Sequence, residues 1–171
     1  MQQFAKDILY LAKKIQDDSQ ELNKPPEEGY PAKDERVFPF SIVRGTRGYI
    51  EKVVNQINGT YEMGWYDACA VMLRRLIETL IIEAFEANNI ADNIKNNNGD
   101  YFYLGDLIDI ALNEKTWTLG RNTSNALPRL KGIGDRSAHS RRYNAQRGDL
   151  EKILDDIRDV VQELVSLAKL K

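Results

Sequence analysis

The chain has 171 residues, of which 42% are hydrophobic and 29% are charged, and this length and composition suit one compact domain with a single core. Its formal net charge of -2 excludes a strong overall attraction for nucleic acid or a membrane surface, so an anion-binding site would have to arise from local clustering of Lys and Arg. A single cysteine, Cys69, excludes an internal disulfide.

The apolar segments are too short or too interrupted to act as membrane or export signals. The most apolar run, residues 76–85, contains Glu78 and Glu83. It is shorter than the roughly 20 apolar residues that a helix needs to cross a bilayer. The first residues lack the basic and apolar regions of a secretory signal. We therefore expect a cytoplasmic protein without a membrane span.

Residues 1–45 are predicted to form an N-terminal helix and a proline-rich connector. Apolar residues recur at helical spacing in residues 3–22, which predicts an amphipathic helix that ends before Pro25. Four of the five prolines then lie in residues 25–39, where missing amide donors disfavour regular structure. A short hairpin over residues 37–43 is the alternative to an irregular chain there.

Residues 46–171 are predicted to form a bundle of helices. The next helix is expected to begin near Thr46 and to end at the Asn-Gly pair that closes at residue 59. The segment over residues 65–87 is apolar around most of its circumference, which is typical of a helix at the centre of a bundle. Residues 88–100 are rich in Asn, whose side chains favour turns, and are predicted to be a loop.

Three further helices complete the prediction. One covers residues 104–112, and a second covers about residues 124–131 and is expected to end at the two glycines of residues 132–134. The last covers residues 150–168, with Asp149 as its N-cap. Because no segment shows the sustained alternation of a strand, the sequence predicts an all-α bundle of five to six helices.

The residue inventory excludes several kinds of chemical site. One histidine and one cysteine are too few ligands for a zinc centre, so no metal or cofactor is expected. The chain lacks a Gly-rich phosphate loop followed by Lys-Ser or Lys-Thr, and it lacks the nucleophile elbow of a hydrolase. A Ser-His-acid triad around His139 is not favoured, because nothing places a serine on a strained turn.

The strongest local charge lies in residues 129–147, which we call the basic segment. It contains one acid, Asp135, and six basic residues: Arg129, Lys131, Arg136, Arg141, Arg142 and Arg147. A basic stretch is more often a solvated helix face than a binding site, yet this is the part of the chain with an obvious attraction for phosphate. Arg129, Arg141, Arg142 and Arg147 are therefore candidates for nucleic-acid binding.

His139, the only histidine, allows two interpretations of the basic segment. Imidazoles exchange protons near neutral pH and cationic side chains stabilise a phosphate transition state, so His139 with Arg136, Lys131 and Asp135 could form a catalytic site. Alternatively, glycines end one helix, Asp135 caps the next, and His139 bonds a backbone carbonyl or packs at the end of the bundle. The residues alone favour the structural interpretation.

A second charged group lies on the predicted central helix. Glu78 follows Arg74 by four residues and Arg75 by three, which predicts a structural ion pair on the helix surface. Because this helix is expected to be central, one of the arginines could instead be partly buried or face the basic segment.

At these residues the sequence resembles a known family. "YEMGWYDACAVMLRRLIETLI", residues 61–81, and "LKGIGDRSAH", residues 130–139, resemble the HEPN superfamily, and in particular its uncharacterised bacterial HEPN-like domains of unknown function. The resemblance covers about residues 46–168. It implies a helical bundle that commonly forms a homodimer and that occurs in prokaryotic defence and toxin-type systems. Its catalytic members are metal-independent ribonucleases that use an Arg and a His.

The family motif carries over unevenly. His139 stands at the family histidine, Gly134 at its glycine and Asp135 at its polar residue, whereas Lys131 stands where the family has its arginine. A lysine ammonium cannot form the two parallel hydrogen bonds to a phosphate that an arginine guanidinium forms. A helical module that binds a nucleic acid, nucleotide or partner protein is therefore our first expectation. A metal-independent ribonuclease is the alternative, with His139 as general acid or base and Lys131 or Arg136 as the cation.

Residues 61–78 are also similar to one tetratricopeptide unit. A solenoid needs at least about three such repeats, and we find no second copy along the chain. This interpretation is therefore less favoured than the HEPN-like bundle.

Overall fold

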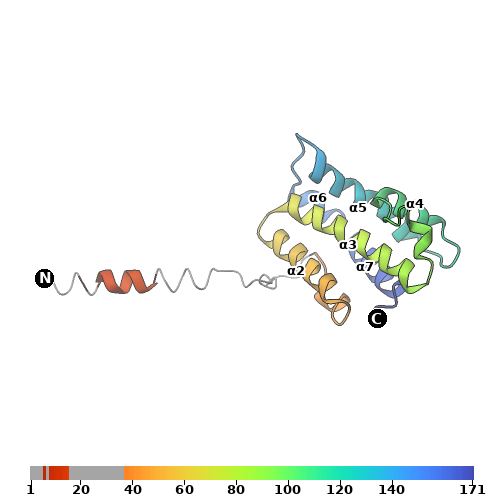
Figure 1. Ribbon diagram of the computed structural model, residues 1–171. Helices are drawn as coiled ribbons and strands as arrows, with labels where there is room; N and C mark the ends of the chain where they lie inside the picture. The colour runs from red at the N-terminus through yellow and green to blue at the C-terminus, as the bar shows by residue number, and fades with distance from the viewer. Residues whose placement is uncertain (1–5, 7, 16–36) are drawn as a thin grey trace. The chain divides into compact units, whose positions relative to one another are not determined.

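The computed structural model describes residues 6, 8–15 and 37–171. The chain divides into two units, Met1–Tyr30 and Pro31–Lys171, and the helices of the second are shown in Figure 1. In the first unit residues 8–15 are helical, within the predicted helix over residues 3–22. The rest of that helix and the connector up to residue 36 lie outside the described residues.

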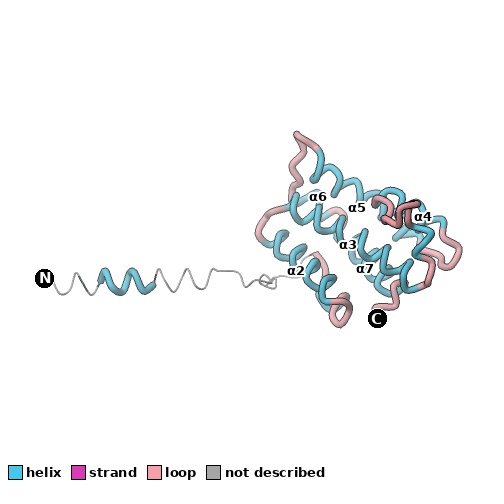
Figure 2. Tube along the Cα trace, viewed as in Figure 1, coloured by secondary structure: helices cyan, strands magenta, loops and turns pink. Residues whose placement is uncertain are grey.

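The second unit is built from helices. It contains η1 (Phe40–Ile42), α2 (Gly48–Glu62), α3 (Tyr66–Ala87), η2 (Ala91–Ile94), α4 (Leu104–Asn113), α5 (Arg121–His139), α6 (Arg147–Glu151) and α7 (Leu154–Leu167). Residues 37–171 contain no strand (Figure 2), and their β-pairing is limited to an isolated bridge between Lys95 and Tyr101. The predicted all-α bundle is confirmed. None of the helices in the described part of the chain is long and apolar enough to cross a membrane.

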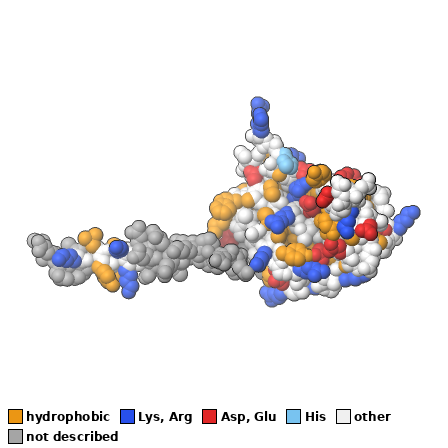
Figure 3. All heavy atoms as spheres, in the orientation of Figure 1, with side chains coloured by type: hydrophobic (Ala, Val, Ile, Leu, Met, Phe, Trp, Pro, Cys, Tyr) orange, Lys and Arg blue, Asp and Glu red, His pale blue; other side chains and the backbone are white. Residues whose placement is uncertain are grey.

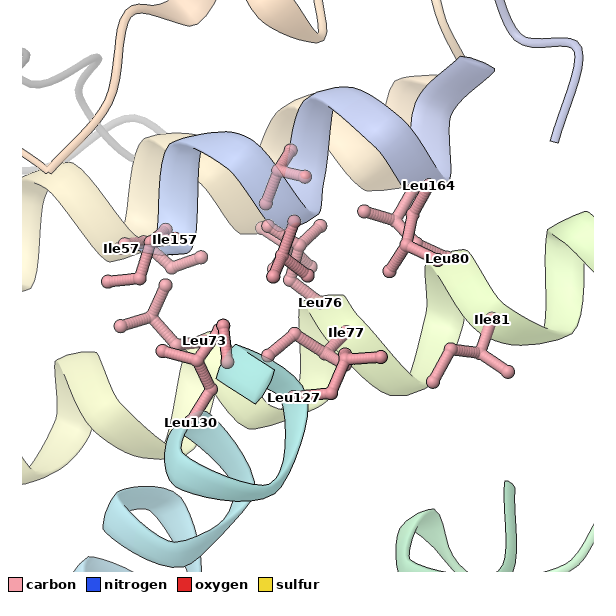
Figure 4. Close-up of a cluster of buried hydrophobic side chains, with 14 of the residues drawn as sticks. Ile57, Leu73, Leu76, Ile77, Leu80, Ile81, Leu127, Leu130, Ile157 and Leu164 are labelled. Carbon is pink, nitrogen blue, oxygen red and sulfur yellow. The ribbon is translucent and has the colours of Figure 1, made fainter. Parts of the chain in front are cut away.

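The helix α3 lies at the centre of the bundle, as its all-round apolar sequence predicts. It packs against α2, α4, α5, α6 and α7. Figure 4 shows how its side chains meet those of the neighbouring helices: Leu73, Leu76, Ile77, Leu80 and Ile81 of α3 gather with Ile57 of α2, Leu127 and Leu130 of α5, and Ile157 and Leu164 of α7. Full burial of each such side chain contributes about 1.5–3 kcal/mol, so this cluster supplies much of the driving force for folding.

The segment before α2 is not a hairpin. Residues 40–42 form η1, and Val37, Phe38 and Val43 beside it are fully buried. Asn58 of α2 holds this segment in place, because its amide donates to the Phe38 carbonyl at 3.1 Å. The chain therefore packs against α2, and the alternative of a hairpin is wrong.

The same bond explains why α2 continues beyond the predicted end at residue 59. The Asn58 side chain is buried and bonds another segment, so it does not act as a local turn former. The helix ends at Glu62, and the turn follows at Gly64, whose φ of 76° is in the left-handed region that glycine adopts without strain.

The helix α5 corrects the sequence prediction most strongly. It runs without a break from Arg121 to His139, through both Gly132 and Gly134. A Cβ atom on Gly134 would lie 2.6 Å from the Arg74 Cβ and 3.1 Å from the Ala70 carbonyl oxygen of α3. Gly134 therefore allows two helices to approach closely. The predicted break at these glycines is wrong, and so is the predicted N-cap role of Asp135, which lies inside the helix.

The C-terminal segment forms two helices, α6 and α7, and the predicted single helix over residues 150–168 is wrong. Asp149 is not the N-cap of α6: Gln146 is, and the Asp149 carboxylate accepts a hydrogen bond from the Gln146 backbone N–H at 3.1 Å. This reciprocal capping box satisfies the first amides of α6. The apolar face of α7 is buried against the bundle, as predicted.

Candidate nucleic-acid interface

An open groove of about 640 Å³ lies where α3, the start of α4 and the end of α5 meet. It is lined by Arg74, Tyr103, Gly105, Asp106, Lys131, Asp135, Arg136, His139 and Ser140. All four candidate catalytic residues of the sequence analysis thus line one groove. They do so because α5 is continuous: Lys131, Asp135 and His139 follow one another at intervals of four residues along one face of the helix.

A network of ion pairs joins α3 to α5 beside this groove. Arg74 Nε donates to Asp135 Oδ1 at 2.8 Å, and Arg74 Nη1 donates to Glu78 Oε2 at 3.4 Å. The ammonium of Lys131 donates to Asp135 Oδ2. The predicted ion pair between Arg74 and Glu78 is therefore present, and Arg74 also faces the basic segment. Arg75 is exposed and takes no part in this network.

This network fixes the charge state of Asp135 and the position of Lys131. Partial burial acts to raise the pKa of Asp135, but the hydrogen bonds and charges of Lys131 and Arg74 outweigh it and hold that pKa below its usual range. A Cβ atom on Gly105 would lie 3.2 Å from the Lys131 Cε, so the lysine stem packs across the first turn of α4. The charge of Lys131 is thus already paired within the protein.

His139 and Arg136 lie one turn apart at the end of α5 and form no ion pair with a described residue, although the charge of Asp149 acts on Arg136. The His139 side chain is exposed and makes no hydrogen bond with a described residue, so the carbonyl bond of the structural interpretation is not present. The Arg136 guanidinium lies 5.1 Å from the centre of the Tyr143 ring. The imidazole is therefore open to solvent.

The other basic residues do not gather on one surface. Arg129 pairs with Asp156 of α7 at 2.9 Å, and Arg147 pairs with Glu151 at 2.8 Å. Arg141 and Arg142 follow the end of α5, are exposed, and form no ion pair with a described residue. Figure 3 shows basic side chains projecting from this turn above the exposed histidine.

We define the α5 end as Arg136, Arg141 and Arg142. Of the six cations in the basic segment, Arg129, Lys131 and Arg147 have acidic partners within 4 Å in the described part of the chain. The guanidinium groups of the α5 end have none. The local positive charge that the sequence indicates is therefore concentrated at one end of one helix.

Sequence reasoning did not find the groove residues on α4. Tyr103 stands at the N-cap of α4 and is 84% exposed, and Asp106 lies in the first turn of this helix. No motif connects them with His139, since the contact depends on how α4 crosses α5. A tyrosine directly before the predicted helix over residues 104–112 is the one signal that the sequence offers, and only the structure shows that its side chain is exposed.

The groove has no features of a metal site. No group of three or more His, Cys, Asp or Glu side chains among residues 37–171 could hold a metal ion. Comparison of the chain with protein-family models, with curated proteins and with solved structures finds no match.

Proposed function

We propose that this protein is a helical RNA-binding module whose α5 end contacts the phosphate backbone. The observation that carries the proposal is a set of three exposed arginines, Arg136, Arg141 and Arg142, that form no ion pair with a described residue. Arg136 lies beside the Tyr143 ring and is attracted by the charge of Asp149, whereas Arg141 and Arg142 extend beyond the helix. In a protein of net charge -2, such a cluster is a local site for anions. The resemblance of residues 61–81 and 130–139 to HEPN-like domains supports the same ligand class and a homodimer.

The number of free arginines sets the expected salt dependence. Each phosphate contact on a single strand contributes about -0.7 to the slope of log K against log salt concentration. Three contacts therefore give a slope of about -2 per protomer, or roughly a tenfold loss of affinity for a threefold increase in salt. A homodimer that presents two α5 ends to one RNA would double this slope.

The test is a charge reversal at the α5 end with a matched reversal elsewhere. Arg141→Glu with Arg142→Glu should weaken binding of a labelled single-stranded RNA in fluorescence anisotropy and reduce the salt slope by about two thirds. Lys115→Glu with Arg121→Glu makes the same change in net charge at the other end of α5. Arg121 and His139, the first and last residues of α5, lie about 27 Å apart along the helix.

The control decides whether the site is local. If the Lys115 and Arg121 reversal weakens binding as much as the Arg141 and Arg142 reversal, RNA responds to the net charge of the protein and the α5 end is only a solvated face. If the wild-type protein shows no salt-dependent binding of RNA, the proposed function is wrong.

A metal-independent ribonuclease is the second candidate, and the position of His139 in the groove beside Arg136 favours it. In this reaction a neutral imidazole would accept the ribose 2′-hydroxyl proton. The 2′-oxygen would then form a bond to phosphorus as the bond to the 5′-oxygen breaks, giving a 2′,3′-cyclic phosphate, and solvent water would supply the proton that the leaving 5′-oxygen takes up. Arg136 would stabilise the charge on the phosphate. It is better placed than Lys131, whose ammonium is paired with Asp135.

Cleavage and binding are separable by one substitution. The wild-type protein should cleave single-stranded RNA in the presence of EDTA, and His139→Ala, purified in the same way, should bind the RNA without cleaving it. If both proteins leave the RNA equally intact under conditions where both bind it, the ribonuclease candidate is refuted and the binding module stands.

A further inference from the structure

Tyr103 occupies a position that neither helix stability nor core packing explains. It is the N-cap residue of α4 but makes no side-chain capping bond, and its side chain is 84% exposed. Capping residues such as Ser or Asp stabilise a helix by about 1 kcal/mol relative to residues that cannot cap. The tyrosine therefore provides neither this stabilisation nor appreciable buried area.

The backbone that carries this ring is nevertheless well anchored. The Leu107 amide donates to the Tyr103 carbonyl at 3.0 Å in the first turn of α4, and Leu104 next to it is fully buried. The neighbouring Tyr101 differs, since its hydroxyl donates to Glu86 at 2.5 Å and Lys95 lies over its ring. Tyr103 makes no comparable contact with a described residue, so its ring is a free aromatic surface on a fixed backbone.

This free ring lines the same groove as Arg136 and His139. Proteins bind single-stranded nucleic acids with two elements: basic side chains that contact the phosphates, and aromatic rings on which unpaired bases stack. Every base has a face that can stack, so such binding tolerates different sequences. The groove, at about 640 Å³, is within the usual size of small-ligand clefts, about 300–1,000 Å³, and so has room for one nucleotide.

We propose that Tyr103 stacks against an unpaired base while the phosphates of the same strand contact the α5 end, so that the site selects single-stranded over double-stranded RNA. This inference rests on the proposed RNA binding. In a duplex the base faces are covered by their neighbours, so the ring gains nothing from a double strand, whereas the arginines attract the phosphates of both forms.

Stacking predicts a loss of affinity that does not depend on salt. Tyr103→Ala should weaken binding of a single-stranded RNA oligonucleotide by about 5- to 150-fold, the range that stacking of one base gives. The salt slope should stay at its wild-type value, because no phosphate contact is lost. Tyr103→Phe keeps the ring and should bind within about twofold of wild type, and binding of the same sequence as a duplex should not change with either variant.

Trp65→Ala is the matched control. Trp65 is also an exposed aromatic residue at a helix N-cap without a side-chain capping bond, at 65% exposure, but it does not line the groove. Its removal should leave RNA affinity at the wild-type value. Thermal unfolding followed by circular dichroism should show that all three variants fold, since both side chains are exposed.

The outcomes separate this inference from the function on which it rests. Wild-type protein that binds neither form of RNA overturns the proposed function. Wild-type protein that binds RNA while Tyr103→Ala binds equally well, or loses salt dependence along with affinity, overturns stacking alone. If Tyr103→Ala changes the protein from dimer to monomer in sedimentation experiments, the ring lies at a contact between two copies of the chain, and stacking is again overturned.

Discussion

Gly134→Ala is expected to destabilise the protein by forcing α3 and α5 apart. The added Cβ would lie 2.6 Å from the Arg74 Cβ and 3.1 Å from the Ala70 carbonyl oxygen. Carbon atoms in van der Waals contact lie about 3.5–4.0 Å apart, so the helices must separate by about 1 Å. The protein cannot relieve this contact by rotating a flexible side chain, because one of the two atoms belongs to the backbone of α3 and the other is bonded to it.

The magnitude follows from two opposing effects. Overpacking of a well-packed site typically costs about 1–3 kcal/mol. Alanine in a helix interior is more favourable than glycine by about 0.5–1 kcal/mol, which offsets part of this cost. The difference is a net loss of about 0–2.5 kcal/mol in the free energy of unfolding, and the short 2.6 Å approach places Gly134→Ala toward the upper part of this range. The separation would also lengthen the bond between Arg74 and Asp135, now 2.8 Å.

Gly132→Ala is the control, since Gly132 lies in the same helix and a Cβ there meets no atom within 4 Å. The free energy of unfolding of Gly132→Ala should rise by about 0.5–1 kcal/mol, because alanine has the higher helix propensity. Urea unfolding at neutral pH, followed by circular dichroism, should give a lower midpoint than wild type for Gly134→Ala and a higher one for Gly132→Ala, with the same slope. A Gly134→Ala protein as stable as Gly132→Ala would refute the close approach of the two helices.

Two further results are expected. Asp135→Asn should lower the free energy of unfolding by about 1–3 kcal/mol at neutral pH, because it leaves Arg74 and Lys131 without their shared carboxylate. Since the folded protein lowers the Asp135 pKa, this stabilisation is present above the unfolded value of about 4 and is lost as pH falls through the folded value. The free energies of unfolding of the wild type and Asp135→Asn, measured by urea titration, should converge in that acid range. A difference that stays constant with pH would contradict the proposed role of the Asp135 carboxylate. Burial raises the pKa of Cys69 to about 12, so a thiol reagent at neutral pH should modify it only as fast as the protein opens, and rapid modification of native protein would contradict this.

The helices were predictable where the apolar pattern was strong. The segment over residues 65–87 shows apolar residues on most faces, and α3 covers residues 66–87 at the centre of the bundle. Helix α4 agrees with the prediction over residues 104–112 to within one residue at its end. In both segments the local pattern and the tertiary packing favour the same structure.

The predictions of helix ends were wrong where a residue contacts a segment that is distant in sequence. Gly134 lowers local helix propensity, yet the helix continues because α3 packs directly against it. Asn58 is a turn former in sequence, but its amide bonds Phe38, 20 residues earlier. Asp149 is a good N-cap by type, and the actual cap lies three residues before it, at Gln146. The residue type indicates which local structure a residue favours, but it does not indicate which distant residue it will contact in the folded protein.

The candidate site was predictable only where its residues are close in sequence. His139, Arg136, Lys131 and Asp135 are close in sequence, and a continuous helix brings them to one groove. Tyr103 and Asp106 reach this groove only through the packing of α4 on α5, which no local pattern reports. The sequence also could not show that Arg129 and Arg147 have acidic partners, because the pair to Asp156 joins α5 to α7 and the pair to Glu151 depends on the exact start of α6.

The ion pairs determine which cations can meet a ligand. The ammonium of Lys131 is bonded to Asp135, which also holds Arg74. A phosphate would have to displace this carboxylate to reach either cation, at the cost of leaving it partly buried and unpaired. Arg136 forms no ion pair within the described residues and contacts only the Tyr143 ring, beside the charge of Asp149. It lies three residues from His139, a spacing that sets side chains about 5–6 Å apart on one helix face. In the proposed ribonuclease the cation and the imidazole are therefore neighbours on α5, and the network around Asp135 keeps the two helices beneath them together.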